Sequence, residues 1–279
     1  MHAPEPILFC WSGGKDSAMA LHTLLQQNQF QVVALLTTIT EARVPGFVLA
    51  NPGSTEDRIA MHGVRRELLH RQAESLRLPL HEIRIPPQCI NPIYEARMEA
   101  ALSHFYDRGV RKVAFGDIFL EDLRAYREKN LARINMTALF PIWKRDTREL
   151  IQSFHHQGFR AIAACIDSKA LDPSFAGREL DDSFFRDLPS TADPCGENGE
   201  FHTFVFDGPI FHLPIPIRTG QIVNRDGFIF CDLLLVAAPD ARPTVIPSGG
   251  PPPLRPAVEE SVFPRKVSET SEKEKSKNA

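Results

Sequence analysis

The stretch FCWSGGKDSA, residues 9–18, places two adjacent glycines between two apolar patterns. Glycine permits positive φ and close backbone approach, but it weakens a regular element that contains it. Residues 7–11 indicate a buried strand, and the leucines along 15–29 indicate a helix. The glycines therefore fall at a strand-to-helix junction, where backbone N–H groups and the helix dipole favour an anion.

Strand and helix patterns alternate from this junction to about residue 166. Strands are predicted at 32–38, 80–85, 111–118, 137–143 and 159–166, and helices at 61–78, 94–109, 122–134 and, capped by Asp146, 147–158. Parallel strands need crossover connections, so the alternation predicts an α/β fold with a Rossmann-like parallel sheet and helices on both faces. Ligands on such sheets bind at the carboxyl ends of the strands.

The pattern changes after this alternation. Residues 181–188 indicate a short helix, and 199–211 and 220–236 indicate strands, the latter folded at NRDG into a hairpin. We expect an α/β domain over residues 1–168, a smaller α+β region over 169–238, and a disordered tail rich in proline and charge over 239–279. Residues 42–57 indicate a long loop.

Composition excludes several classes of protein. A formal net charge of −3 argues against a protein that works chiefly by binding nucleic acid. Five scattered cysteines without a CxxC pair indicate a reduced, cytoplasmic protein rather than a disulfide framework or a zinc ribbon. No secretion signal is apparent and no apolar run is long enough to span a membrane, so we expect no membrane partner.

The SGGKDS loop differs from the Walker A pattern, which needs four residues between its first glycine and its Gly-Lys pair. It resembles the PP-loop of the N-type ATP pyrophosphatases, which implies that it holds the β,γ-pyrophosphate of ATP. The glycines would let backbone amides converge, the hydroxyls would donate to phosphate, Lys15 would add a charge, and Asp16 would orient the loop or hold Mg²⁺. The residues implied to bind ATP here are Ser12, Gly13, Gly14, Lys15, Asp16 and Ser17.

Residues 116–151 and 192–211, the latter containing CGENGE, resemble the diphthine–ammonia ligase family. The resemblance implies that Gly116 and Asp117 lie beside the nucleotide. It implies an acceptor pocket lined by Arg124, Glu128, Cys195, Gly196, Glu197, Asn198 and Glu200, and catalytic roles for Lys15, Asp16, Glu197 and Glu200. Thr38 and His62, near the end of the second predicted strand, are further candidates for contact with the nucleotide.

Simpler interpretations stand beside these. The acids of CGENGE could merely cap a turn, Cys195 is more typical of a small buried residue than of a nucleophile, and any single arginine of 122–134 could face water.

The resemblance implies an ATP-dependent ligase that adenylates an acceptor carboxylate, releases pyrophosphate, and then transfers ammonia with release of AMP. The implied partners are ATP, ammonium and a small-molecule or modified-protein carboxylate, and a homodimer is left open. Two other functions compete: a PP-loop enzyme that modifies tRNA, and an ATP-binding regulator without turnover.

Overall fold

The computed structural model describes residues 3–41, 58–59 and 63–236 of the chain. The loop expected at 42–57, His62 and the tail expected at 239–279 lie outside the described residues. No helix in the described part is long and apolar enough to cross a membrane.

The first sheet has five parallel strands in the order β4-β2-β1-β5-β6, and the short β3 pairs antiparallel with the end of β2. The strands are β1 (Glu5–Cys10), β2 (Phe30–Thr40), β3 (Arg58–Ile59), β4 (Leu80–Ile85), β5 (Lys112–Ala114) and β6 (Thr137–Leu139). β6 is shorter than the strand expected at 137–143, because residues 141–144 form a turn.

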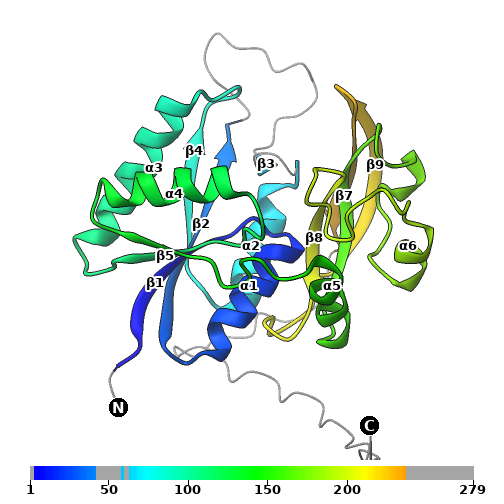
Figure 1. Cartoon of the computed structure of the whole chain (residues 1–279). Coiled ribbons are helices and arrows are strands. Elements are labelled where there is room, and N and C mark those ends of the chain that lie inside the picture. Colours follow the sequence, from blue (N-terminus) through cyan, green and yellow to red (C-terminus); the bar gives the residue numbers. More distant parts are fainter. Residues whose placement is uncertain (1–2, 42–57, 60–62, 237–279) are drawn as a thin grey trace, which may run out of the picture.

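Helices cover both faces of this sheet (Figure 1). They are α1 (Lys15–Gln26), α2 (Arg66–Leu76), α3 (Asn91–Tyr106) and α4 (Glu121–Ala132). Side chains alternate along β1, so Ile7 and Phe9 pack with α1 and α2, whereas Leu8 packs with Leu102 of α3 and Leu131 of α4. The α/β, Rossmann-like fold predicted from the alternation is confirmed.

A second, antiparallel sheet follows in the order β8-β7-β10-β9. Its strands are β7 (Arg160–Asp167), β8 (Phe201–Asp207), β9 (Ile217–Arg225) and β10 (Phe228–Leu235). The predicted hairpin is confirmed: Arg225 pairs with Phe228, and Asp226 and Gly227 between them have φ of 52° and 87°. Positive φ at both turn residues matches the right-handed twist of the strands.

The prediction that residues 159–166 close the parallel alternation is wrong. β7 pairs antiparallel with β8 and β10 and is the first strand of the second sheet. Its interior residues are buried on both faces, as they would be in a central strand of either sheet. Hydrophobic pattern therefore identifies the strand but not the sheet to which it belongs.

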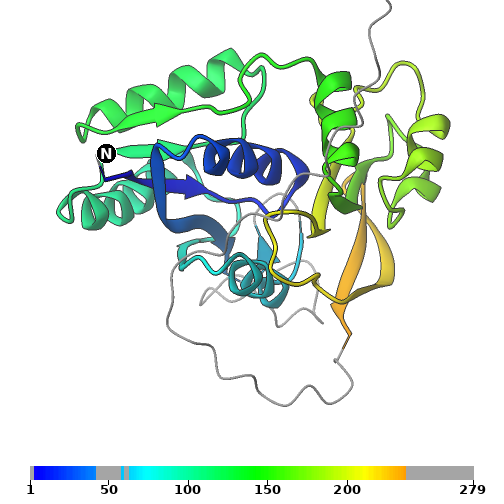
Figure 2. The ribbon, with the colours of Figure 1, turned by 90° about the horizontal axis from the view of Figure 1, so that it is seen from below.

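The two sheets share one apolar core. A single cluster of buried side chains runs from β1, α1 and α2 to β7 and β8 and on to α5 (Thr147–His156) and α6 (Asp182–Asp187). Asp146 caps α5 as predicted, because its side chain accepts the N–H groups of Arg148 and Glu149 at 2.9 and 3.0 Å. α1 contacts β8, and the two views place the second sheet beside α1 and the parallel sheet (Figures 1 and 2).

Candidate active site

The loop SGGKDS lies where the strand order of the parallel sheet reverses. β1 is flanked by β2 and β5, which the chain reaches in opposite directions, and the crevice outside their carboxyl ends is the usual ligand site of such sheets. Gly116 follows β5 and packs against the first turn of α1. A Cβ at Gly116 would come within 2.9 Å of the Ser17 backbone nitrogen, so this position requires glycine.

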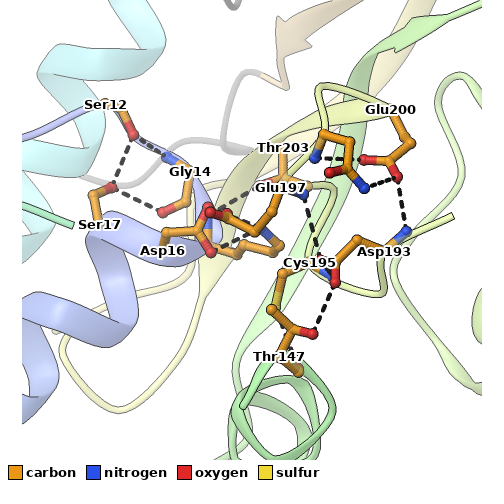
Figure 3. A network of polar contacts seen from close by, with 12 residues as sticks. Ser12, Gly14, Asp16, Ser17, Thr147, Asp193, Cys195, Glu197, Glu200 and Thr203 are labelled. Atoms are coloured by element: carbon orange, nitrogen blue, oxygen red, sulfur yellow. Dashed lines mark hydrogen bonds and ion pairs between the residues drawn. The ribbon is translucent and has the colours of Figure 1, made fainter. Parts of the chain in front are cut away.

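Hydroxyl groups organise the loop from within (Figure 3). The Ser17 hydroxyl donates to the Gly14 carbonyl at 2.8 Å, and the Ser12 hydroxyl lies 3.1 Å from Ser17 Oγ. The Gly14 N–H donates to Ser12 Oγ at 3.3 Å. Gly13 has a φ of 80°, which glycine adopts without strain. The predicted phosphate-binding residues therefore form one compact turn at the start of α1.

Lys15 and Asp16 form a partly buried ion pair at this turn. The Lys15 side chain is 4% exposed, and its Nζ lies 2.7 and 2.8 Å from the two carboxylate oxygens of Asp16. Burial acts to lower the pKa of Lys15, but Asp16, Cys195 and Glu197 act in the other direction and the net pKa is raised. Lys15 is therefore a cation held among acidic groups.

The acidic loop, residues 193–200, comes from the second sheet and reaches Lys15. The loop leads directly into β8, and the ring of Phe201, the first residue of β8, lies with its centre 5.7 Å from Lys15 Nζ. Figure 3 shows the side chains of Asp16 and Glu197 together at the start of α1. The fold thus joins two motifs that are about 180 residues apart in sequence, as a shared catalytic role would require.

Glu197 has the most perturbed carboxyl group of this site. Its pKa is raised from the usual 4.5 to about 7, chiefly by burial and next by the charge of Asp16; Asp193 and Asp117 add to the rise, and Lys15 partly opposes it. A carboxyl group that titrates near neutral pH can accept and release a proton under working conditions. The arrangement makes Glu197 the strongest acid–base candidate in the acidic loop.

Glu200 holds the acidic loop in shape. One of its oxygens, Oε1, accepts the Asp193 N–H at 2.8 Å and the Asn198 side-chain amide at 2.9 Å, and Oε2 accepts the Asn198 N–H at 2.9 Å. Burial acts to raise the pKa of Glu200, but these hydrogen bonds outweigh it and the pKa is lowered. Gly196 has a positive φ of 70°, and a Cβ there would meet the Phe201 carbonyl oxygen at 2.8 Å, so this position requires glycine.

Cys195 is a buried residue within the acidic loop. Its thiol donates to the Thr147 carbonyl at 3.3 Å, and burial raises its pKa to about 12. A protonated, hydrogen-bonded thiol is a poor nucleophile, so the contacts favour the packing role weighed for this residue.

The residues predicted on and before α4 form two separate ion pairs. Asp117 accepts a bidentate pair from Arg127, with distances of 2.7 Å from Nε and 3.2 Å from Nη2. Arg124 Nε donates to Glu128 at 2.8 Å, and its guanidinium lies 4.8 Å from the centre of the Trp143 ring. Within the described residues, the side chains of Arg124 and Glu128 hydrogen-bond to each other, and no hydrogen bond joins either side chain to the acidic loop.

Thr38 lies in β2, paired with Ile83 of β4, and is half-buried. The residues that the structure describes contain no group of three or more His, Cys, Asp or Glu side chains placed to hold a metal. Both Asp16 oxygens face Lys15. The donor set therefore fits only a Mg²⁺ ion that takes most of its ligands from phosphate oxygens and water.

Sequence reasoning missed Asp193, which anchors the acidic loop. Its Oδ1 accepts the Cys195 N–H at 2.7 Å, and its Oδ2 accepts the Thr147 hydroxyl at 2.8 Å. An aspartate two residues before a turn is a recognised sign of such a side-chain-to-backbone bond. The hydrogen bond to Thr147 depends on the packing of α5, and no pattern in the sequence around Asp193 predicts it.

Comparison with known proteins agrees with this architecture. Residues 7–137 match the family model of the diphthamide synthase N-terminal domain, and residues 146–233 match that of the diphthamide synthase C-terminal domain. A diphthine–ammonia ligase of Bos taurus is 26% identical over 237 residues, which cover 78% of this chain and 85% of the relative. That of Schizosaccharomyces pombe is 24% identical over 250 residues, or 83% of this chain and 39% of the relative.

The interval between the two family models, residues 138–145, begins within β6 and ends just before α5. The N-terminal model covers most of the first sheet, its helices and SGGKDS, and the C-terminal model covers α5, most of the second sheet and CGENGE. Because both diphthamide synthase domains match, the chain belongs to the diphthine–ammonia ligase family, whose members carry these domains.

Proposed function

We propose that the chain is an ATP-dependent ligase that converts an acceptor carboxylate into an amide. The proposal rests chiefly on one observation: the phosphate loop and the acidic loop meet at Lys15. Asp16 and Glu197 both act to raise the pKa of this lysine. It is supported by membership of a family whose curated relatives are named diphthine–ammonia ligases.

In the first step, an acceptor oxygen attacks the α-phosphorus of ATP and the bond to the bridging oxygen of pyrophosphate breaks. Lys15 and the first turn of α1 would stabilise the charge that develops on the leaving pyrophosphate. Because Lys15 is buried and preorganised, little reorganisation is needed as that charge appears. Mg²⁺ would neutralise part of the phosphate charge, with Asp16 as the protein residue to hold it.

In the second step, ammonia attacks the carbonyl carbon of the acyl adenylate, and AMP leaves with one oxygen of the original carboxylate. Ammonium must lose a proton before its nitrogen can attack. Glu197 would accept that proton, since its pKa of about 7 leaves a deprotonated fraction at neutral pH. Glu200 would act indirectly, by fixing the loop that carries Glu197.

An isotope experiment tests the reaction. The chain is incubated with ATP, Mg²⁺, ammonium and an acceptor carboxylate labelled with ¹⁸O, chosen from a panel of small carboxylates and diphthine-bearing protein. The proposal predicts that one ¹⁸O atom appears in AMP, that pyrophosphate is released in equal amount, and that the acceptor gains an amide. ADP as the nucleotide product, or unlabelled AMP, would refute adenylation of the carboxylate.

Two controls separate the competing functions. Asp16→Ala should abolish pyrophosphate release. Lys129→Ala, in the last turn of α4, should leave it unchanged. Tight ATP binding with no AMP from any acceptor would instead favour a regulator without turnover. Pyrophosphate release that requires tRNA rather than a carboxylate would favour an RNA-modifying enzyme.

A further inference from the structure

The outer edge of β8 is covered by the phosphate loop. β8 is the end strand of the second sheet and pairs along its other edge with β7. An edge strand presents backbone groups that need partners. The Val205 N–H donates to the Gly13 carbonyl at 2.9 Å, so the loop takes the place of a neighbouring strand. The backbone of the nucleotide loop is therefore fixed from the sheet that carries the acidic loop.

Gln72 of α2 completes this junction. Its side chain is fully buried within the leucine-rich face of α2, where an unsatisfied amide would be costly. Nε2 donates to the carbonyls of Gly13 and Val205 at 2.9 and 2.7 Å, and Oε1 accepts the Trp11 indole N–H at 2.9 Å. One amide thus joins α2, the residue after β1, the phosphate loop and β8.

Thr203 makes the second connection. Its side chain is 3% exposed, and its Oγ1 accepts the Lys15 backbone N–H at 2.9 Å. Thr203 stands three residues after Glu200, which organises the acidic loop. A Cβ at Gly14 would lie 3.1 Å from the Thr203 carbonyl oxygen, so the loop packs closely on β8 here.

We propose that Gln72 and Thr203 are positioning residues for ATP: by holding Gly13 and Lys15 against β8, they keep the phosphate loop in its binding shape. Neither residue needs to touch the nucleotide. The consequence is that the second sheet determines affinity for ATP as well as for the acceptor. This inference rests on the proposed function, because it assumes that the SGGKDS loop binds the phosphates of ATP.

The two hydrogen bonds act on affinity through the fraction of molecules whose phosphate loop has the binding shape. When a loop adopts its competent shape only part of the time, the apparent dissociation constant rises in inverse proportion to that fraction. Replacing the hydroxyl of Thr203 by a methyl group leaves the Lys15 N–H without its acceptor. The loop can then populate conformations other than the one that binds phosphate. Serine keeps the oxygen and should keep the shape.

The test compares Thr203→Val with Thr203→Ser in the full chain by calorimetric titration with a non-hydrolysable ATP analogue and Mg²⁺. Thr203→Val should raise the dissociation constant at least tenfold at a temperature where the protein is fully folded, and Thr203→Ser should stay within about twofold of the wild type. Thr23→Val is the matched control, because the Thr23 hydroxyl bonds the Met19 carbonyl within α1, away from the loop. It should leave the affinity unchanged.

Thermal unfolding without nucleotide is measured in parallel. A purely structural role for Thr203 would lower the midpoint and leave the analogue affinity of the folded protein as in the wild type, and that result would overturn the inference. An equal or tighter affinity in Thr203→Val would do the same. A wild-type chain that binds no analogue would refute the proposed function itself, which is a distinct outcome.

Discussion

Lys15 keeps its positive charge in a nearly closed environment because acidic groups surround it. Removing it would leave Asp16 and Glu197 facing each other without a cation. We predict that Lys15→Ala lowers kcat/KM for ATP by about a hundredfold, the order expected when one preorganised charged donor is lost. Pyrophosphate release under limiting ATP measures this. Lys144→Ala, which removes an exposed lysine paired with Glu121, is the control and should retain wild-type turnover.

Glu197 gives a pH-dependent prediction. Its pKa in the folded protein, about 7, lies above the usual 4.5, so the folded state binds the proton more tightly and loses stability as pH rises through this interval. Glu197→Gln has no carboxyl group to ionise, so its stability should not fall in this way as pH rises. The variant should be more stable than the wild type at pH 8 by on the order of 1 kcal/mol, since the half-buried group is partly screened. The difference should vanish below pH 4.5.

Urea unfolding at several pH values checks the prediction, and the same variant should bind ATP yet form no amide. If Glu197→Gln were less stable than the wild type at pH 8, the raised pKa would be contradicted. An unchanged rate of amide formation would remove Glu197 from the acid–base role without affecting the stability argument.

At the level of residues, sequence alone pointed to the glycine loop and to CGENGE because each is a local pattern whose chemistry depends on neighbouring positions. Their meeting at Lys15 is seen in the structure. Asp193, Gln72 and Thr203 could not be found in this way. Each acts through a hydrogen bond to a group far away in sequence, and a single buried glutamine or threonine has no local pattern that distinguishes it.

Among the elements, the acidic loop depends on Glu200 for its shape. The pKa of Glu200 is lowered by its hydrogen bonds, so the stabilisation is present above its usual value and is lost as pH falls. We predict that Glu200→Gln costs about 1–2 kcal/mol at pH 7, because an amide cannot accept all three N–H bonds. The cost should shrink as pH falls below the usual 4.5 and through the lowered pKa of the folded protein.

Thermal unfolding monitored by circular dichroism measures the change, with Glu149→Gln at an exposed position of α5 as a control that should shift the midpoint little. A Glu200→Gln variant as stable as the wild type at pH 7 would show that the loop does not rely on this carboxylate. The prediction separates Glu200, which shapes the loop, from Glu197, whose replacement should stabilise the protein.

Hydrophobic periodicity predicted most elements of the first sheet and the β9–β10 hairpin, because strand, helix and turn patterns are local. It failed to place β7. β7 is buried on both faces in the second sheet, as the end of β1 is in the first, so the apolar pattern of residues 160–167 suits either sheet. The partners of β7 are decided by β8 and β10, which follow some 34 and 61 residues later.

For the whole molecule, the important feature is that the two sheets are not independent. One core cluster contains side chains from both, and the backbone hydrogen bond between Val205 and Gly13 crosses from one to the other. The two family models are separated by residues 138–145, but the apolar core is continuous across that separation. A nucleotide bound at the loop would therefore stabilise both sheets.

This shared core predicts a single unfolding transition. Trp11, which is buried beside the phosphate loop, reports on the first sheet by fluorescence, and the buried thiol of Cys231 reports on the second by pulsed labelling. Their midpoints in urea should coincide, because opening either sheet exposes the common core. ATP at about one hundred times its dissociation constant should stabilise both by about 2.7 kcal/mol. A Cys231 midpoint clearly below that of Trp11, or a shift by ATP confined to Trp11, would mean that the second sheet unfolds alone and cannot hold the loop in shape.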